Sequence, residues 1–349
     1  MIIRKNMYLC SGMSKNYQLV GISSVMHLLV DGLCICTMFL LAEVYGVNFG
    51  AYGDKVSMGA VFIYNVLAFM SQPLTGLMAD RMAHRHWLLL WSALLLTLAV
   101  ACAALIPMLV ANSPNLMGDV FGECMLISVA VLLGAGNSLF HVWGGKLAVV
   151  KTGNDIRALG VFVSTGVLGL AIGMVFRSWA LLYGLLLAIV GLSVVYIRCD
   201  DGTSIPVSDI KERSNWLTPV RIWTLVVALM LFVGYRSFAS EVFSGGITKT
   251  EEIVLLIAVA SMVGKMAGGW IARFMGILKS LMVLLGGVIL CFLFRDSYEA
   301  VLLAGVFLMS CTMPITLYLA NVLLPKREGL AFGLLAAALL PGYLLAVML

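Results

Sequence analysis

Two pairs of polar residues stand four positions apart inside long apolar runs. His27 and Asp31 form the first pair, and Asn137 and His141 form the second. Residues four apart share one face of a helix and can touch. A carboxylate beside an imidazole can take up and release a proton near neutral pH. The alternative for the first pair is a static hydrogen bond that ties two helices together, and for His141 a helix–helix tie is equally open.

Arg236 is the only arginine deep inside an apolar run, and Glu241 follows it by about a turn. A fixed cation that faces Asp31 across a cavity would suit an anionic substrate. The alternative is an intramembrane ion pair with Glu241 or Asp31 that holds two halves of the molecule together. We expect Lys265 to extend toward the cytoplasmic side. Asn65 is a candidate on the substrate or proton pathway, although a hydrogen bond between helices explains it equally simply.

The composition places these residues in a membrane protein. Hydrophobic residues make up 62% of the 349 residues and charged residues 11%, with a mean hydropathy of +1.06. A soluble domain is about half apolar and about a quarter charged, so the lipid bilayer must be the main solvent. The excess of 22 Lys and Arg over 17 Asp and Glu is an orientation signal and does not indicate a nucleic-acid partner.

Eleven apolar runs are long enough to cross a bilayer, which takes about 20 residues of helix. They are 18–42, 56–79, 87–110, 123–146, 158–176, 178–197, 222–241, 252–272, 278–294, 299–323 and 329–349. With the N-terminus inside, sixteen basic residues lie on the cytoplasmic side and four outside, as the positive-inside rule requires. The short loop after residue 45 (residues 46–54) carries turn signals.

The runs fall into two groups around one polar stretch. We predict an all-α polytopic membrane protein of two pseudo-symmetric helix bundles, with about 11 transmembrane helices (six plus five) and a cytoplasmic N-terminus. Residues 1–198 form the N-terminal bundle, 199–219 a cytoplasmic linker, and 220–349 the C-terminal bundle. Similar loops after the second and eighth runs indicate an internal repeat, which is typical of secondary transporters. Continuous apolar runs exclude a β-barrel.

Signatures of enzymes and of bound cofactors are missing. The sequence contains no phosphate-binding GxxxxGK[ST] loop, no HExxH and no nucleophile elbow. Its eight cysteines are scattered, without zinc-ligand spacing. We therefore predict no catalytic residues, no cofactor and no metal, and ATP-driven pumping by this chain alone is excluded.

The loop after the second run contains Gly76, Asp80, Arg81 and Arg85. These residues and their spacing resemble the signature of the major facilitator superfamily, whereas Ala83 and His84 depart from its usual Gly and Arg. The resemblance implies that Asp80 and Arg81 hold the cytoplasmic ends of the two bundles together when the cavity opens outward.

Three segments are similar to the fosmidomycin-resistance branch of that superfamily. They are 26–31, 71–76 and 134–141. The superfamily has twelve spans and this chain shows eleven. We therefore expect an outside C-terminus and a flank that is open to a partner or a second copy of the chain.

Together these features predict a secondary active transporter of the bacterial inner membrane. It would export a small organic solute by alternating access and couple the export to protons through Asp31 and His27. The alternative is a non-transporting membrane subunit or a receptor-like descendant of the same fold. The substrate and the protons are the expected small-molecule partners.

Overall fold

The computed structural model describes residues 2–82, 86–205, 218–245, 247, 250–295 and 298–348, with side chains from residue 15 onward. All regular elements in these ranges are helices, which satisfy their own backbone hydrogen bonds, as lipid requires. In chain order they are α1 (Ile2–Met70), α2 (Gln72–Arg81), α3 (Trp87–Asn112), α4 (Pro114–Met117), α5 (Val120–Thr152), α6 (Ile156–Val175), α7 (Trp179–Cys199), α8 (Pro219–Gly245), α9 (Glu251–Met275), α10 (Ile277–Leu293), α11 (Glu299–Cys311), α12 (Met313–Leu323), α13 (Glu328–Ala337) and α14 (Leu339–Met348).

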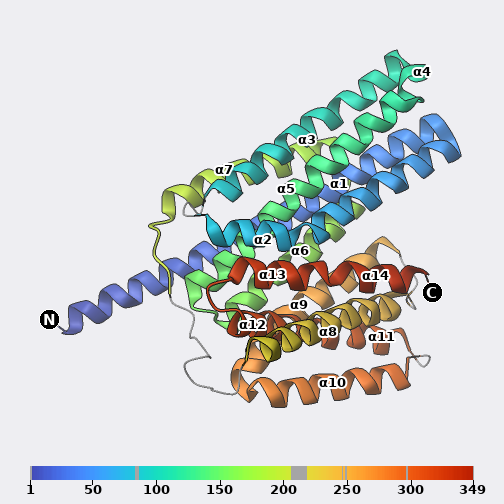
Figure 1. Ribbon diagram of the computed structural model, residues 1–349. Helices are drawn as coiled ribbons and strands as arrows, with labels where there is room; N and C mark the ends of the chain where they lie inside the picture. The colour runs from blue at the N-terminus through green and yellow to red at the C-terminus, as the bar shows by residue number, and fades with distance from the viewer. Residues whose placement is uncertain are drawn as a thin grey trace.

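Each predicted membrane span corresponds to helix in the described chain. Nine helical stretches among these residues are long and apolar enough to cross a membrane, and α10 is a shorter apolar helix. The first stretch, Lys15–Arg81, is 67 residues long and folds back on itself, so that it supplies two spans (Figure 1). The pairs α11–α12 and α13–α14 supply the tenth and eleventh spans. The prediction of an all-α polytopic membrane protein is confirmed.

The predicted loop at residues 46–54 is wrong, because helix continues on both sides of a single residue. Gly50 has φ 55° and ψ −137° and reverses the chain inside α1. This left-handed region favours glycine, which has no Cβ. The two arms are in close contact, since a Cβ on Gly53 would lie 2.1 Å from the Tyr45 carbonyl oxygen. The Tyr45 hydroxyl also donates to the Gly122 carbonyl at 2.8 Å, which ties the reversal to α5.

Prolines divide two of the spans into consecutive helices. Pro73 stands in the first turn of α2 and Pro314 in the first turn of α12, where a missing N–H is tolerated. At each break a hydroxyl donates to the preceding turn. Ser71 Oγ lies 2.5 Å from the Leu67 carbonyl oxygen, and Thr312 Oγ1 lies 2.7 Å from that of Met309.

The helices form two groups that touch along a limited seam. In Figure 1, α1, α3, α5 and α7 lie in the upper group and α8 to α14 in the lower one. Within the groups α1 packs on α5, α6 and α7, and α9 packs on α11. Between the groups α6 packs on α9 and α2 packs on α13. The boundaries at 198 and 220 stay a prediction, because most of the linker lies outside the described residues. The cytoplasmic location of the N-terminus also stays a prediction.

The start of the linker is anchored by a buried ion pair. Lys151, in the last turn of α5, bonds Asp200 just after α7, and neither side chain is exposed. Although burial alone would raise the pKa of the Asp200 carboxyl, hydrogen bonds from Lys151 and the Gly202 N–H hold that pKa below its usual range. The Ile205 N–H adds a 2.7 Å bond to the Val150 carbonyl. The linker therefore leaves the first group from a fixed point.

We predict that Asp200→Asn lowers the free energy of unfolding by about 3–5 kcal/mol at neutral pH, because it leaves the buried Lys151 with only the Asp201 carboxylate at 4.0 Å. Glu43→Gln is the matched control. It removes an exposed carboxylate paired with Arg177, which is worth about 0–1 kcal/mol. Thermal unfolding in detergent measures both.

The pH dependence of Asp200 has a definite sign. Because its pKa is depressed by folding, its contribution is complete above the unfolded value, about 3.9, and is lost as the pH falls through the lower folded value. The melting temperature of the wild type should therefore converge on that of Asp200→Asn only at acidic pH. Equal melting temperatures of the two proteins at neutral pH would contradict the anchoring role.

Candidate functional site

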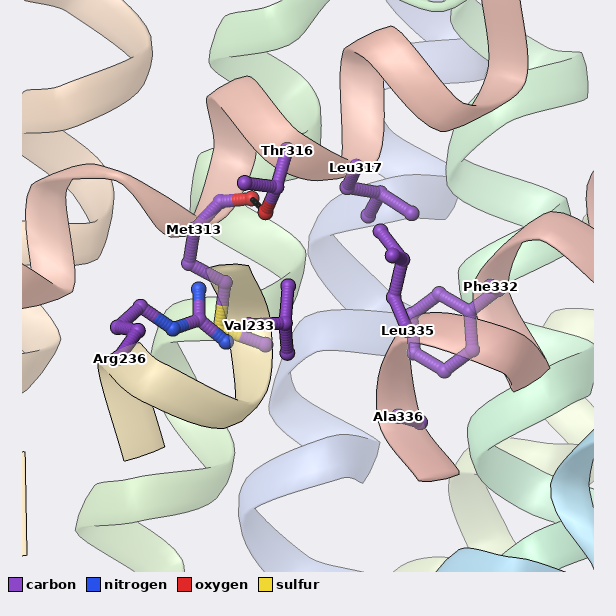
Figure 2. A pocket seen from close by; sticks show the side chains of 8 residues that line it. All are labelled: Val233, Arg236, Met313, Thr316, Leu317, Phe332, Leu335 and Ala336. Atoms are coloured by element: carbon purple, nitrogen blue, oxygen red, sulfur yellow. Dashed lines mark hydrogen bonds between the residues drawn. The ribbon is translucent and has the colours of Figure 1, made fainter. Parts of the chain in front are cut away.

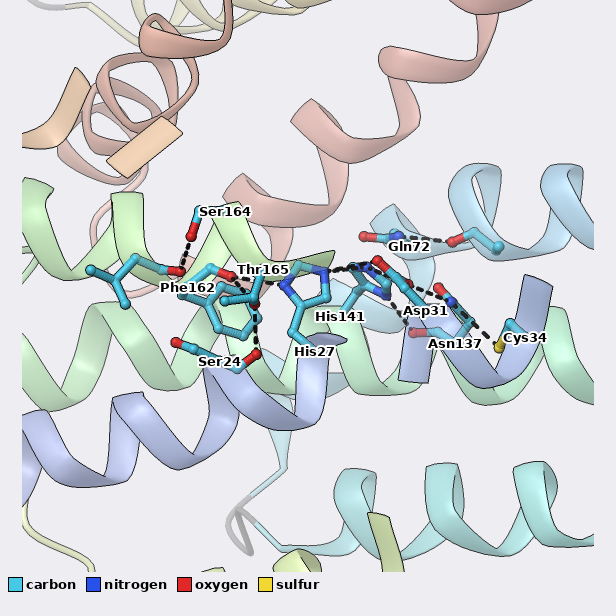
Figure 3. Close-up of polar contacts among 12 residues, drawn as sticks. Ser24, His27, Asp31, Cys34, Gln72, Asn137, His141, Phe162, Ser164 and Thr165 are labelled. Carbon is cyan, nitrogen blue, oxygen red and sulfur yellow. Dashed lines mark hydrogen bonds and ion pairs between the residues drawn. The ribbon is translucent and has the colours of Figure 1, made fainter. Parts of the chain in front are cut away.

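Three ionisable side chains meet in the upper group of helices, between α1, α5 and α6 (Figure 3). His27 and Asp31 come from α1 and His141 comes from α5. His27 is 5% exposed and Asp31 is 6% exposed. The two pairs identified from their spacing thus form a single cluster, which we call the His–Asp–His cluster.

The two imidazoles face one carboxylate and each other. His27 Nε2 lies 3.3 Å from Asp31 Oδ2, and His141 Nε2 lies 3.4 Å from Asp31 Oδ1. The two Nε2 atoms are 2.8 Å apart, a hydrogen-bond distance. The rings meet edge to face, at 90°. All three groups therefore converge on one small volume.

The remaining ring nitrogens decide where the protons are. His27 Nδ1 lies 2.8 Å from the Phe162 carbonyl oxygen, and His141 Nδ1 lies 3.0 Å from that of Asn137. A carbonyl oxygen only accepts, so each Nδ1 carries a hydrogen and donates it. A neutral imidazole has one N–H, which leaves two bare Nε2 lone pairs in contact. One added proton turns this contact into an N–H···N bond and makes the pair cationic beside Asp31.

An amide holds the carboxylate from the other side. Asn137 Nδ2 donates to Asp31 Oδ1 at 3.1 Å and lies 3.3 Å from the Tyr64 hydroxyl and 3.7 Å from Cys34 Sγ. Sequence reasoning missed Cys34, which it considered only as one of eight scattered cysteines. Its position three residues after Asp31, on the same helix face, is the signal that could have found it.

Small residues of α6 make room for the cluster. A Cβ on Gly166 would lie 2.3 Å from Asp31 Oδ2 and 2.5 Å from His27 Nε2. One turn further along α6, a Cβ on Gly169 would lie 2.0 Å from the Leu28 carbonyl oxygen. Glycine lets two membrane helices approach this closely. The glycine-rich fifth span is therefore what brings the backbone of α6 against the ionisable face of α1.

Among the described residues, the His–Asp–His cluster is the group whose ligand atoms could hold a metal ion, since these atoms lie within 4.8 Å of one another. Two nitrogens bound to one metal at about 2.1 Å, with angles of 90–109°, lie about 3.0–3.4 Å apart. The Nε2 atoms are closer, at 2.8 Å. The arrangement thus fits a shared proton better than a metal ion.

A small cavity lies in the lower group of helices, with Arg236 in its wall (Figure 2). It has a volume of about 20 Å³, enough for about one water molecule. Its lining is mostly apolar and comes from α8, α12 and α13: Val233, Arg236, Met313, Thr316, Leu317, Phe332, Leu335 and Ala336. An organic solute needs several hundred Å³, so the cavity is too small to hold one in this conformation.

Arg236 is buried without a counter-ion. Its side chain is 5% exposed, its Nη1 has no hydrogen-bond partner, and it forms no ion pair with any residue that the structure describes. The alternative considered from the sequence, an ion pair with Asp31 or Glu241, is therefore not formed among these residues. Lys265, expected to extend toward the cytoplasm, is half-buried, and its charge interacts with those of Arg236 and Asp31.

Two predicted pathway residues stay apart from the cluster and from the cavity lining. Asn65 Nδ2 donates to the Val61 carbonyl of its own helix at 2.9 Å. Glu241 is half-buried on α8, and its backbone carbonyl accepts from Ser244 Oγ at 3.1 Å. Their assignment to the pathway stays a prediction.

Aromatic rings connect the cavity with the cluster. Phe332 lines the cavity, and its ring centroid lies 6.1 Å from that of Phe162. The Phe162 ring stacks on His27 at 4.8 Å with an interplanar angle of 21°, while its carbonyl accepts the His27 Nδ1 hydrogen. A change in the cavity wall can therefore reach His27 through two packed rings.

A second set of contacts joins the two groups where α2 ends. Asp80 accepts from the N–H groups of Gly329 and Leu330, in the first turn of α13, at 2.9 Å each. It also accepts from Lys146 Nζ at 2.9 Å. The first N–H groups of a helix lack partners within the helix and attract a negative charge. We call Asp80, Lys146 and these two N–H groups the Asp80 latch.

The other signature residues lie around the latch. Gly76 is buried against α13, since a Cβ there would fall 2.3 Å from the Gly329 carbonyl oxygen. Arg81 is exposed, and Arg85 lies outside the described residues. Sequence reasoning counted Lys146 only as a cytoplasmic charge, and its place after two glycines in the fourth span was the available signal.

We predict that Gly166→Ala separates the His–Asp–His cluster while keeping each of its ionisable groups, because the new methyl group must displace Asp31 or His27. In histidine-labelled protein, the far-downfield proton signal of the N–H···N bond should be present in the wild type and absent in the variant. Gly191→Ala is the control, since nothing lies within 4 Å of that position. A signal that survives Gly166→Ala would refute the shared proton.

Comparison with known proteins supports one family. Residues 20–347 match the Major Facilitator Superfamily. Among solved structures, the chain is similar to the fucose:proton symporter of E. coli (14% identity, 95% of this chain and 90% of that one, TM-score 0.62) and to an outward-facing bacterial homologue of the iron transporter ferroportin (16%, 95% and 91%, 0.63). The human organic anion transporter MFSD10 is a third (15%, 95% and 92%, 0.60). A search of curated proteins finds no match. Since the family match covers nearly the whole chain, this protein belongs to the major facilitator superfamily.

Proposed function

We propose that the protein is a proton-coupled secondary transporter that exports a small organic solute by alternating access. Membership of the superfamily and a transporter fold support the class of activity. The absence of a phosphate-binding loop from the sequence leaves an ion gradient as the energy source. The bacterial inner membrane is the location we propose, and export follows the resemblance of three segments to the fosmidomycin-resistance branch.

The observation that carries proton coupling is the contact between His27 Nε2 and His141 Nε2 at 2.8 Å. With both Nδ1 hydrogens directed at carbonyls, this contact is repulsive when empty and attractive when it holds one proton. Asp31 stabilises the proton through its charge. A buried site that gains stability from a single proton is what a proton-coupled carrier requires.

The rings of Phe162 and Phe332 supply a route by which solute and proton influence each other. A solute that binds in the small cavity must enlarge it and displace its wall, which includes Phe332. Phe162 packs between that residue and His27. Displacement would weaken the ring stacking and the Nδ1 hydrogen bond that orient His27. We infer that solute binding changes the affinity of the cluster for its proton.

The Asp80 latch and the α6–α9 contact would define the state closed to the cytoplasm. A Cβ on Gly160 would lie 2.8 Å from the Lys265 carbonyl oxygen, so the two groups touch closely at this seam too. Export would then require both contacts to open and re-form in each cycle, which makes the strength of the latch a determinant of turnover.

We predict that Asp31→Asn abolishes coupled transport and leaves the protein folded, because the amide keeps the shape of the carboxylate and removes its charge. Purified protein in proteoliposomes, loaded with a pH-sensitive dye, would show proton flux in response to solute gradients. Asp54→Asn, at an exposed carboxylate, should behave as wild type.

Wild-type flux in Asp31→Asn would refute the role of the cluster in coupling. Absence of solute-driven flux in the wild type, over a broad panel of organic solutes, would instead favour the non-transporting alternative.

We predict that Asp80→Ala slows turnover more than it weakens solute binding. The substitution leaves two N–H groups of α13 without their acceptor and leaves Lys146 with only the Ala79 carbonyl, which destabilises the latched state by about 1–3 kcal/mol, or about 5–150-fold in its population. Asp119→Ala is the control, because Asp119 stands at the start of α5 without a side-chain capping bond. An unchanged transport rate in Asp80→Ala would argue against gating.

A further inference from the structure

A buried positive charge without a counter-ion lies beside the small cavity, and it is not part of the His–Asp–His cluster. Arg236 is 5% exposed and has an unpartnered Nη1. Lys265, on α9, is half-buried, and its charge interacts with that of Arg236. Among the described residues, Asp31 is the carboxylate whose charge acts on Lys265. Asp31 is already bound by two imidazoles and an amide.

A buried charge without a counter-ion is unfavourable in any protein and more so in a membrane. Such a group persists where it binds something that the resting structure lacks. Water can solvate one face of Arg236, since the cavity holds about one molecule. It cannot neutralise the charge. The missing component of this site is therefore a negative charge that arrives with a ligand.

The surroundings of Arg236 indicate what carries that charge. A guanidinium presents its donors in a flat fork, which matches a planar carboxylate in a two-bond arrangement. Apart from Arg236 and Thr316, the lining consists of aliphatic, aromatic and methionine side chains (Figure 2). A ligand that satisfies both features has one carboxylate and an apolar body.

We propose that the transported solute is an amphipathic monocarboxylate, whose carboxylate binds Arg236 and whose apolar part lies against Phe332 and Leu335. This inference rests on the proposed transport function and specifies its substrate class. It also assigns proton and solute to different groups of helices. The proton would bind on α1 and α5, and the anion would bind between α8, α12 and α13.

Thermal stabilisation of the purified protein tests the site without a transport assay, because a ligand that binds the folded state raises the melting temperature with its concentration. The probes are acetate, hexanoate and benzoate, each beside its uncharged amide. We expect hexanoate and benzoate to raise the melting temperature of the wild type, and the amides to have no effect. Arg236→Gln should remove the response. Arg236→Lys should bind about tenfold more weakly, because it keeps the charge and loses the fork.

Two controls separate binding from folding. Arg273→Gln changes an exposed arginine of α9 and should respond as wild type. Without ligand, Arg236→Gln should melt no lower than wild type, because it removes an unpaired charge. A large loss of melting temperature in Arg236→Gln that Asp31→Asn restores would show a structural ion pair and overturn the proposal.

The experiment also distinguishes this inference from the proposed function. If no carboxylate stabilises the wild type through Arg236, while an uncharged or cationic solute drives proton flux, the substrate class is wrong and proton-coupled transport stands. If hexanoate or benzoate binds through Arg236 but drives no proton flux, the anion site stands and the coupled function falls.

Discussion

The interaction on which the site depends is the contact between two imidazole nitrogens over a single carboxylate. Two backbone carbonyls, of Phe162 and Asn137, hold the ring hydrogens on the far side, so the facing nitrogens have lone pairs and no hydrogen of their own. In water such a contact would be relieved by solvent. Here α6 closes over it through Gly166, and the electrostatic cost can be relieved only by a proton or by movement of a helix. Protonation and helix position are thereby linked.

The second group of helices also contains a charged side chain whose counter-ion is missing. The cluster lacks one positive charge when empty, and the neighbourhood of Arg236 lacks one negative charge. The two sites lie on opposite sides of the seam between the groups and are joined by the packed rings of Phe162 and Phe332. In the proposed transport cycle, occupancy of each site alters the free energy of the other. Ring packing across the seam is a physical contact that both sites can bias.

Periodicity and composition predicted much of this arrangement. Long apolar runs specify helices in lipid because no other backbone structure satisfies its own hydrogen bonds there, so the eleven spans were readable. The spacing of His27 and Asp31, and of Asn137 and His141, placed each pair on one helix face. The contact between the two pairs could not be predicted from the sequence, because it depends on how closely α1, α5 and α6 approach one another. The direction of Lys265 stays a prediction, because the direction of a long side chain depends on the charges that surround it in three dimensions.

The reversal at Gly50 has a mechanical consequence. The first two spans are joined by one residue in a left-handed conformation, with Gly53 packed against the Tyr45 carbonyl. A hinge between two helices needs conformational freedom in the residues that connect them, and a connection of one residue provides very little. We therefore expect the two spans, which contain His27, Asp31 and Tyr64, to move together as one rigid unit. A motion that exposes the cluster to the other side of the membrane must move both spans. The contacts that change are then those between the two groups of helices, α6–α9 and α2–α13, and the turn at Gly50 keeps its conformation.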